Sequence, residues 1–131
     1  MLFLNSWFED SLNMIGYVES TKNSIRGNHY HPVQTQKCLL IKGKYISVTK
    51  DLMEPDSIME TRIISEGDLS IIPPNVAHTM VFLEDSVLLN LVNGERDHKN
   101  YGMTHTLKHS LVDKDLSKLL INSYKTECRV Q

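Results

Sequence analysis

The stretch IRGNHYHP, residues 25–32, holds two histidines, His29 and His31, that are separated by one residue. Side chains at this spacing cannot face the same way on a helix, but on a β-strand they point to one side. A third histidine, His78, ends the stretch IPPNVAH at residues 72–78, where two prolines predict a turn before another strand. If the strands line one interior, the three imidazoles meet in a cavity. That geometry indicates a metal site or an acid–base site.

Length and composition limit the possibilities. The chain has 131 residues, which predicts one domain, and a net charge of −2 with both signs interspersed. Lysine and arginine form no stripe, so neither nucleic acid nor an anionic membrane is the expected partner. The start, MLFLNSWFED, lacks the basic flank of a signal peptide, and no apolar run approaches the ~20 residues needed to span a bilayer. Cys38 and Cys128 do not resemble a disulfide framework, so we expect a cytoplasmic protein with reduced thiols.

Short apolar stretches broken by turn residues predict a mainly β fold. Strands are expected at 14–18, 24–31, 37–42, 44–50, 58–65, 69–72, 78–83 and 86–92. Their spacing of roughly ten residues is typical of an antiparallel sandwich or barrel. A C-terminal helix is expected over residues 111–125, with Asp113 as its N-cap and leucines at helical spacing behind it.

Two of these strands differ in their expected burial. The run KCLLIK (37–42) is continuously apolar, which predicts a strand buried on both faces. The run KYISVTK (44–50) alternates between apolar and polar residues, which predicts a half-buried strand.

The spacing of the histidines, glycines and prolines resembles the two signatures of the cupin barrels. The first likeness runs from Gly27 to Gly43 and the second from Gly67 to His78. The resemblance implies one double-stranded β-helix (jelly-roll) barrel with a short C-terminal helix. We expect an N-terminal strand or arm at 1–23, a cupin core at 24–94, and a closing loop or strand with the helix at 95–131.

In cupins that hold a metal, the matching positions bind one divalent transition ion. By resemblance, the ligands here would be His29, His31, Gln36 and His78. Gln36 is the departure, because cupins usually carry glutamate there, and an amide oxygen offers a dipole but no charge. Three imidazoles with an amide would still accept Zn, Ni, Cu or Fe. The alternative is that the histidines act without any metal.

The stretch IRGNHYHP with Gln36 is also similar to nucleotide-sugar cupins, namely the 3,5-epimerases and, more closely, the dTDP-sugar 3,4-ketoisomerases. The ketoisomerases likewise carry glutamine at this position and use histidine without metal. The resemblance implies a base at His29, a proton partner or orienting group at His31, and a phosphate or sugar contact at Arg26. Tyr101 and Tyr45 are candidate acids, and Tyr45 is also a candidate substrate contact.

Three functions remain open from the sequence. The first is an isomerase or epimerase of a nucleotide-linked keto-sugar in polysaccharide or deoxysugar biosynthesis. The second is a metal-dependent cupin enzyme, either a dioxygenase or a metal-assisted isomerase. The third is a small-molecule-binding cupin without turnover. We expect a homodimer, with the apolar segment LFLNSWF (2–8) covering a partner's sheet edge.

Overall fold

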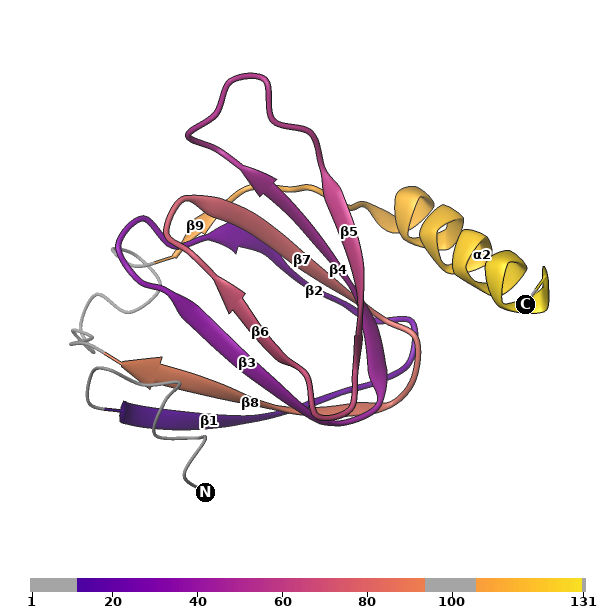
Figure 1. Cartoon of the computed structure of the whole chain (residues 1–131), viewed down its shortest axis with the longest axis horizontal. Coiled ribbons are helices and arrows are strands. Elements are labelled where there is room, and N and C mark those ends of the chain that lie inside the picture. Colours follow the sequence, from indigo (N-terminus) through magenta and orange to yellow (C-terminus); the bar gives the residue numbers. More distant parts are fainter. Residues whose placement is uncertain (1–11, 94–105, 131) are drawn as a thin grey trace.

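Two antiparallel sheets face each other in the computed structural model, which describes residues 12–93 and 106–130 (Figure 1). The strands are β1 (Leu12–Ser20), β2 (Ile25–Tyr30), β3 (Gln36–Lys42), β4 (Lys44–Asp51), β5 (Glu60–Ser65), β6 (Leu69–Ile72), β7 (Val76–Phe82), β8 (Ser86–Asn93) and β9 (Leu107–Lys108). The helix α2 (Lys114–Val130) follows. The strands predicted between residues 14 and 92 are therefore confirmed.

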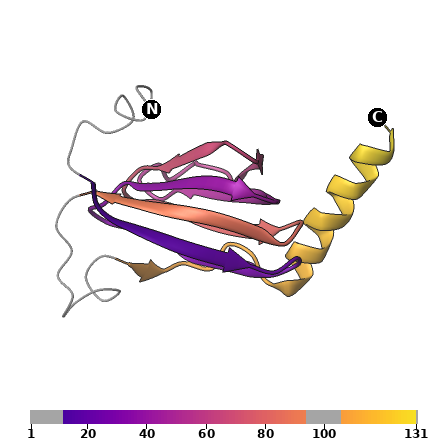
Figure 2. The same ribbon diagram turned by 90° about the horizontal axis from the view of Figure 1, so that it is seen from below.

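The strand order is that of a jelly roll. One sheet has the order β1-β8-β3-β6 and the other the order β5-β4-β7-β2-β9. The predicted cupin-like architecture is confirmed, with one correction. The sheets stack as an open sandwich (Figure 2), and no backbone ladder among the described strands closes them into a barrel.

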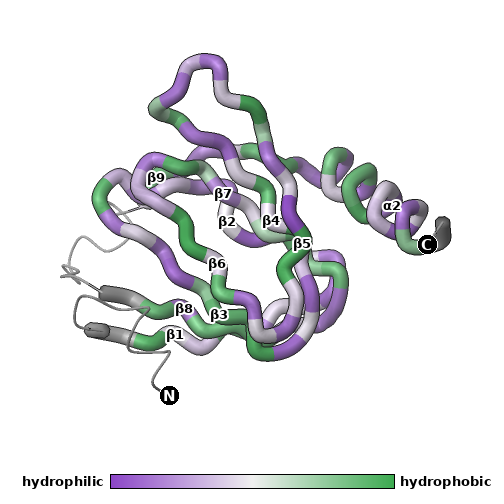
Figure 3. Tube along the Cα trace, viewed as in Figure 1, coloured by the Kyte–Doolittle hydropathy of each residue, from purple (hydrophilic) through white to green (hydrophobic). Residues whose placement is uncertain are grey.

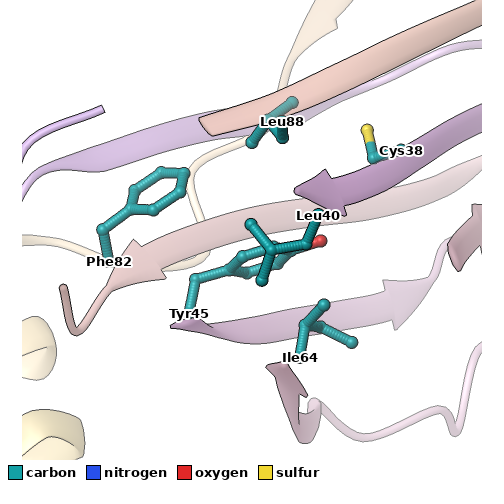
Figure 4. Close-up of a cluster of buried hydrophobic side chains, with 6 residues drawn as sticks. All are labelled: Cys38, Leu40, Tyr45, Ile64, Phe82 and Leu88. Atoms are coloured by element: carbon teal, nitrogen blue, oxygen red, sulfur yellow. The ribbon is translucent and has the colours of Figure 1, made fainter. Parts of the chain in front are cut away.

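The space between the sheets holds one hydrophobic core. Its buried members come from both sheets (Figure 4) and are Cys38, Leu40, Tyr45, Ile64, Phe82 and Leu88. The rings of Tyr45 and Phe82 lie 5.4 Å apart. This core fills one end of the interior and leaves the other end for polar side chains.

A second core joins the five-stranded sheet to α2. Ile46, Val48 and Val81 on the outer face of that sheet pack against Val112 and Ile121. Figure 3 shows the apolar positions recurring along the helix. The predicted cap at Asp113 is confirmed, because its Oδ1 accepts the Leu116 N–H at 2.8 Å. The helix itself begins at Lys114 and extends to Val130, beyond the predicted end.

The burial predicted for two strands is wrong in both cases. On β3, Cys38 and Leu40 are buried, but Ile41 at the end of the strand is 49% exposed. On β4, four consecutive residues from Tyr45 to Val48 are buried. The reason lies in the layers: α2 packs on the outer face of β4, whereas no described element packs on the outer face of β3.

The predicted boundaries at residues 23 and 94 stay predictions. β1, from the predicted arm, pairs along its length with β8 from the predicted core. Within the described part of the chain, no helix is long and apolar enough to cross a membrane.

Candidate functional site

A bulge in β2 decides which side chains of IRGNHYHP face the interior. Gly27 pairs with Thr79 and His29 pairs with His78, so Asn28 is the extra residue. Gly27 and Asn28 have φ angles of +97° and +55°. A Cβ at Gly27 would lie 2.7 Å from the carbonyl oxygen of His78, so glycine alone fits here. The bulge brings Arg26 and His29 to one face, although three positions separate them.

Asn28, turned to the opposite face, fixes the segment before α2. Its Oδ1 accepts the N–H groups of Leu111 and Val112 at 2.9 and 3.0 Å, and its Nδ2 donates to Val112 O at 3.0 Å. It also accepts the Thr79 hydroxyl at 2.7 Å. One residue of the signature therefore holds the helix while its neighbours form the site.

The three predicted histidines do come together between the sheets. The ring of His29 lies 5.0 Å from that of His31 and 4.5 Å from that of His78. His31 and His78 are 5.3 Å apart. One ring nitrogen from each lies within 4.8 Å of the others, which is a spacing that one ion could bridge. His29 and His78 occupy paired positions on β2 and β7, and His31 follows the end of β2.

His78 is the most deeply buried of the three, at 3% exposure. Its Nδ1 lies 3.2 Å from the carbonyl oxygen of Val76, so Nδ1 carries the proton and Nε2 carries the lone pair. Nε2 is buried and has no hydrogen-bond partner among the described residues. Burial, followed by the nearby His29, lowers the pKa of His78 to about 4, so the imidazole is neutral at pH 7.

His31 stands at one end of a chain of hydrogen bonds through the interior. Its Nε2 lies 2.7 Å from Gln36 Oε1, Gln36 Nε2 donates to Cys38 Sγ at 3.1 Å, and the thiol donates to Asn90 Oδ1 at 2.8 Å. Because the amide NH₂ of Gln36 faces sulfur, its oxygen faces His31 and accepts from Nε2–H. On the other side of the ring, Nδ1 lies 3.2 Å from the Thr106 hydroxyl and is left as an acceptor.

His29 is the half-buried member of the cluster. Burial lowers its pKa below the ordinary value, and the nearby His31 lowers it further. A neutral imidazole with an available nitrogen can accept a proton at neutral pH or bind a metal.

The donor set fits a transition metal in part. The three imidazole nitrogens, with the unpartnered Nε2 of His78 among them, match the softness that Zn, Ni, Cu or Fe prefer. Gln36 does not fit as it stands, because its oxygen accepts a hydrogen bond from His31 Nε2. The same His31 nitrogen cannot donate that proton and bind an ion.

The other predicted site residues lie in different surroundings. Arg26 is exposed, with Nε donating to Ser20 Oγ at 2.5 Å and Nη2 to Glu19 O at 2.9 Å. Tyr45 is 1% exposed within the inner core, and burial raises the pKa of its hydroxyl above the ordinary value. Its place as a substrate contact or acid stays a prediction. Tyr101 lies outside the described residues.

Sequence reasoning missed three residues that hold the site, namely Cys38, Asn90 and Thr106. Cys38 and Asn90 lie opposite each other on β3 and β8, 52 positions apart in the chain. The inward alternation of each strand was visible in the sequence. Their pairing depends on the register between the strands, which no local pattern reveals.

An open cleft lies near the histidine cluster, although none of the three histidines is among its lining residues. Its volume is about 650 Å³, and it lies between β4, β5 and β6. Two of its lining residues are cross-strand partners of site residues: Thr49 pairs with His78, and Ile72 pairs with Gln36. The lining of the cleft therefore begins one strand away from His78 and from Gln36.

Known structures share this fold at low sequence identity. CapF, a capsular polysaccharide assembling protein from Staphylococcus aureus, is 19% identical with a TM-score of 0.66, over 78% of this chain and 29% of CapF. A dTDP-4-dehydrorhamnose 3,5-epimerase from Sulfolobus tokodaii is 22% identical with a TM-score of 0.60, over 79% of this chain and 61% of that protein. The epimerase RmlC of Legionella pneumophila, solved with dTDP-4-keto-L-rhamnose, is 17% identical with a TM-score of 0.63, over 85% and 61%.

No protein-family model and no curated protein sequence matches the chain. The chain spans less than a third of the length of CapF, at 29%, and 61% of the two epimerases. The strand order and these likenesses identify a cupin fold, with a three-histidine cluster between its sheets.

Proposed function

We propose that this protein is an isomerase or epimerase of a nucleotide-linked keto-sugar, and that it works by histidine acid–base chemistry. The observation that carries the proposal is the cluster of three imidazoles, one strand away from an open cleft, with Gln36 hydrogen-bonded to His31. Proton removal beside a carbonyl needs a base and a group that stabilises the enolate. The fold shared with sugar-nucleotide epimerases supports the same class of substrate.

His29 is the proposed base. It is the least buried of the three imidazoles, and its lowered pKa keeps it neutral and able to accept a proton at pH 7. His31 is the proposed orienting group, since Gln36 and Thr106 hold both of its ring nitrogens. His78, with a pKa of about 4, is a weak base whose Nε2 suits the acceptance of a hydrogen bond. Tyr101 is the proposed acid that returns the proton.

The test is exchange of a sugar C–H for deuterium in heavy water, followed by NMR on dTDP- and UDP-linked 4-keto sugars. We expect wash-in at a carbon beside the ketone, and a loss of at least 100-fold in His29→Asn. His109→Asn is the control, because the contact of that histidine with Asn28 is made by its backbone N–H. Binding of these sugars without exchange would instead favour the third function, a small-molecule-binding cupin without turnover.

A metal-dependent cupin enzyme is the second candidate, because the three nitrogens lie within 4.8 Å of one another. His29, His31 and His78 would hold the ion, with Gln36 as a fourth ligand after it releases His31. A bound transition metal would polarise a ketone or another substrate oxygen. Elemental analysis of protein purified without added metal separates the candidates. One equivalent of metal that is lost in His78→Ala would count against the metal-free mechanism.

Arg26 is proposed to hold the diphosphate or the sugar of the substrate. A guanidinium grips phosphate oxygens through two N–H groups, and Arg26 is exposed on the strand that carries His29. Arg26→Ala should weaken binding of the nucleotide sugar several-fold by calorimetry, whereas Lys125→Ala on α2 should not. Unchanged affinity in Arg26→Ala would remove this role.

A homodimer and a cytoplasmic location stay proposals. In support of the dimer, the outer face of the sheet β1-β8-β3-β6 leaves apolar side chains exposed, with Tyr17 at 64%, Ile15 at 56% and Ile71 at 53%. On the other sheet, α2 packs over Ile46 and Val81, whereas Ile63 on the same face is 42% exposed. The proposed occupant of this face is a second copy of the chain.

A further inference from the structure

The thiol of Cys38 makes polar contacts inside an apolar core. Cys38 is 1% exposed and packs with Leu40 and Leu88 between the sheets. Its Sγ nevertheless accepts a hydrogen bond from Gln36 Nε2 at 3.1 Å and donates one to Asn90 Oδ1 at 2.8 Å. A valine or leucine would fill this position without either contact. Packing alone therefore does not account for a thiol here.

The contacts of Cys38 follow from the register of the strands. Cys38 on β3 pairs with Asn90 on β8, and Gln36 precedes Cys38 by two residues, so the three side chains share the inner face of their sheet. His31, after the end of β2 in the other sheet, continues the series, with Nε2 2.7 Å from Gln36 Oε1. The chain of hydrogen bonds therefore crosses from one sheet to the other and ends at the histidine cluster.

Such a chain can run in two directions, and its far end selects one. An amide can exchange its oxygen and NH₂ group by rotating through a half turn, and a thiol can donate to either neighbour. Because Asn90 presents its oxygen to Cys38, the thiol proton is directed to Asn90 and the sulfur accepts from Gln36. Gln36 then presents its oxygen to His31, so Nε2 of that ring carries the proton. In the reverse direction, the proton of His31 would lie on Nδ1.

The direction of the chain therefore sets where His31 has its lone pair. In the observed direction the lone pair lies on Nδ1, at 3.2 Å from the Thr106 hydroxyl, and both ring nitrogens are held. The ring of His29, the proposed base, lies 5.0 Å away in an edge-on arrangement. The proton of His31 thus contributes to the electrostatic surroundings of the base, and a change of tautomer would alter them.

We propose that Cys38 and Asn90 are positioning residues of the histidine site, which direct the amide of Gln36 and so keep the proton of His31 on Nε2. Both residues act through Gln36 and His31. The inference rests on the proposed function only where the rate of deuterium exchange is measured.

The test locates the proton of His31 by ¹⁵N NMR of the imidazole rings in the whole chain, at pH 8 and with a chelator present. Protonated and unprotonated nitrogens of a neutral imidazole differ widely in ¹⁵N shift, so a change of tautomer is distinct from a change in packing. The wild type should carry the proton on Nε2. Cys38→Ala and Asn90→Leu each remove the group that sets the direction of the chain. Each should raise the ratio of the Nδ1–H to the Nε2–H form at least five-fold.

Conservative variants should keep the direction of the chain. Cys38→Ser retains a group that both donates and accepts, and Asn90→Asp retains an acceptor that cannot donate, so the proton should stay on Nε2 in both. Cys128→Ala, which removes the exposed cysteine on α2, is the matched control. Asn90 is only half-buried and leucine resembles asparagine in shape. Asn90→Leu therefore keeps the proposal testable if Cys38→Ala does not fold.

A proton on Nδ1 of His31 in the wild type would overturn the proposal. So would an unchanged ratio of the two forms in both Cys38→Ala and Asn90→Leu, or the same shift in Cys128→Ala or Cys38→Ser as in Cys38→Ala.

In the exchange of a sugar C–H for deuterium, Cys38→Ala should lower kcat about ten-fold with KM unchanged, and Cys38→Ser should restore it. The ring measurement needs no substrate. If the tautomer shifts as expected but no sugar is exchanged, the catalytic proposal fails and the positioning of His31 by Cys38 and Asn90 stands. If exchange occurs but the tautomer does not shift, the positioning role fails alone.

Discussion

At the scale of single residues, Gln36 determines how the ring of His31 is hydrogen-bonded. Its oxygen accepts from His31 Nε2 because its NH₂ group is directed to the sulfur of Cys38, which in turn donates to Asn90. Burial raises the pKa of Cys38 to about 11, so the thiol keeps its proton and stays a donor at neutral pH. The interior therefore favours one tautomer of His31, with the proton on Nε2.

Gln36→Glu should turn the cluster into a better metal site. A carboxylate adds a full negative charge beside three imidazoles and offers a second oxygen when one accepts from His31. We expect the affinity for Zn²⁺ or Ni²⁺ to rise at least ten-fold, as measured by calorimetry. Thr35→Glu places the same charge one residue away and should change the affinity less. Equal affinity in the wild type and Gln36→Glu would show that the carboxylate does not reach the ion.

The buried His78 predicts a loss of stability in acid. Its pKa falls from an ordinary value of 6.5 to about 4 on folding, so between these values the unfolded chain binds a proton that the folded chain does not. The stabilisation is complete above pH 6.5 and is lost as the pH falls toward 4. A lowering of the pKa of that size corresponds to about 3 kcal/mol in the free energy of unfolding.

Urea unfolding at pH 7 and pH 4.5, with a chelator present, measures this loss. His78→Asn removes the titrating group. The free energy of unfolding should therefore differ between pH 7 and pH 4.5 by about 2 to 3 kcal/mol less than in the wild type. An equally steep loss in His78→Asn would assign the acid sensitivity to other groups.

At the scale of elements, the bulge in β2 builds the site. Gly27 allows the strand to approach the backbone of His78, and Asn28 as the extra residue turns outward to hold residues 111 and 112. Without the bulge, Arg26 and His29 would face opposite sides of the sheet. The bulge therefore positions Arg26, His29 and the start of α2 together.

Gly27→Ala and Gly67→Ala form a matched pair. Both glycines have positive φ, +97° and +87°, but a Cβ at Gly67 meets nothing within 4 Å, whereas one at Gly27 meets His78 O at 2.7 Å. Gly67→Ala should cost only the backbone strain, about 1 to 2 kcal/mol. Gly27→Ala should cost more in urea unfolding and should shift the NMR signals of the His29 and His78 rings. Equal losses of unfolding free energy in the two variants would mean that the pairing of β2 with β7 adapts to the added methyl group.

At the scale of the whole molecule, the two sheets have different outer surfaces. The helix packs on part of one, and exposed isoleucine and tyrosine side chains lie on the other. We expect Tyr17→Glu to convert a dimer into a monomer in light scattering after gel filtration. Leu119→Glu is the control, because Leu119 on α2 is equally exposed, at 65% against 64% for Tyr17. A wild-type monomer, or a dimer in Tyr17→Glu, would contradict the proposed interface.

Much of this molecule follows from local sequence patterns. Turn residues and short apolar runs predicted the positions of eight strands, and Asp113 before a leucine-rich segment predicted the start of the helix within a few residues. The spacing of His29 and His31, with His78 in a matching strand, predicted the cluster. These features are local because strand alternation, turn chemistry and capping each depend on neighbours in the chain.

Only the tertiary structure decided which strand surfaces are covered and which residues form the hydrogen-bond network of the site. β4 is buried on both faces because α2, more than sixty residues later, packs on its outer side, and β3 is half exposed because its own outer face has no such cover. The bonds from Gln36 through Cys38 to Asn90, and the pairing of His29 with His78, depend on the register between strands that are distant in the chain. Register and layer order result from packing of the whole chain, because each pair of strands is positioned by contacts with the others.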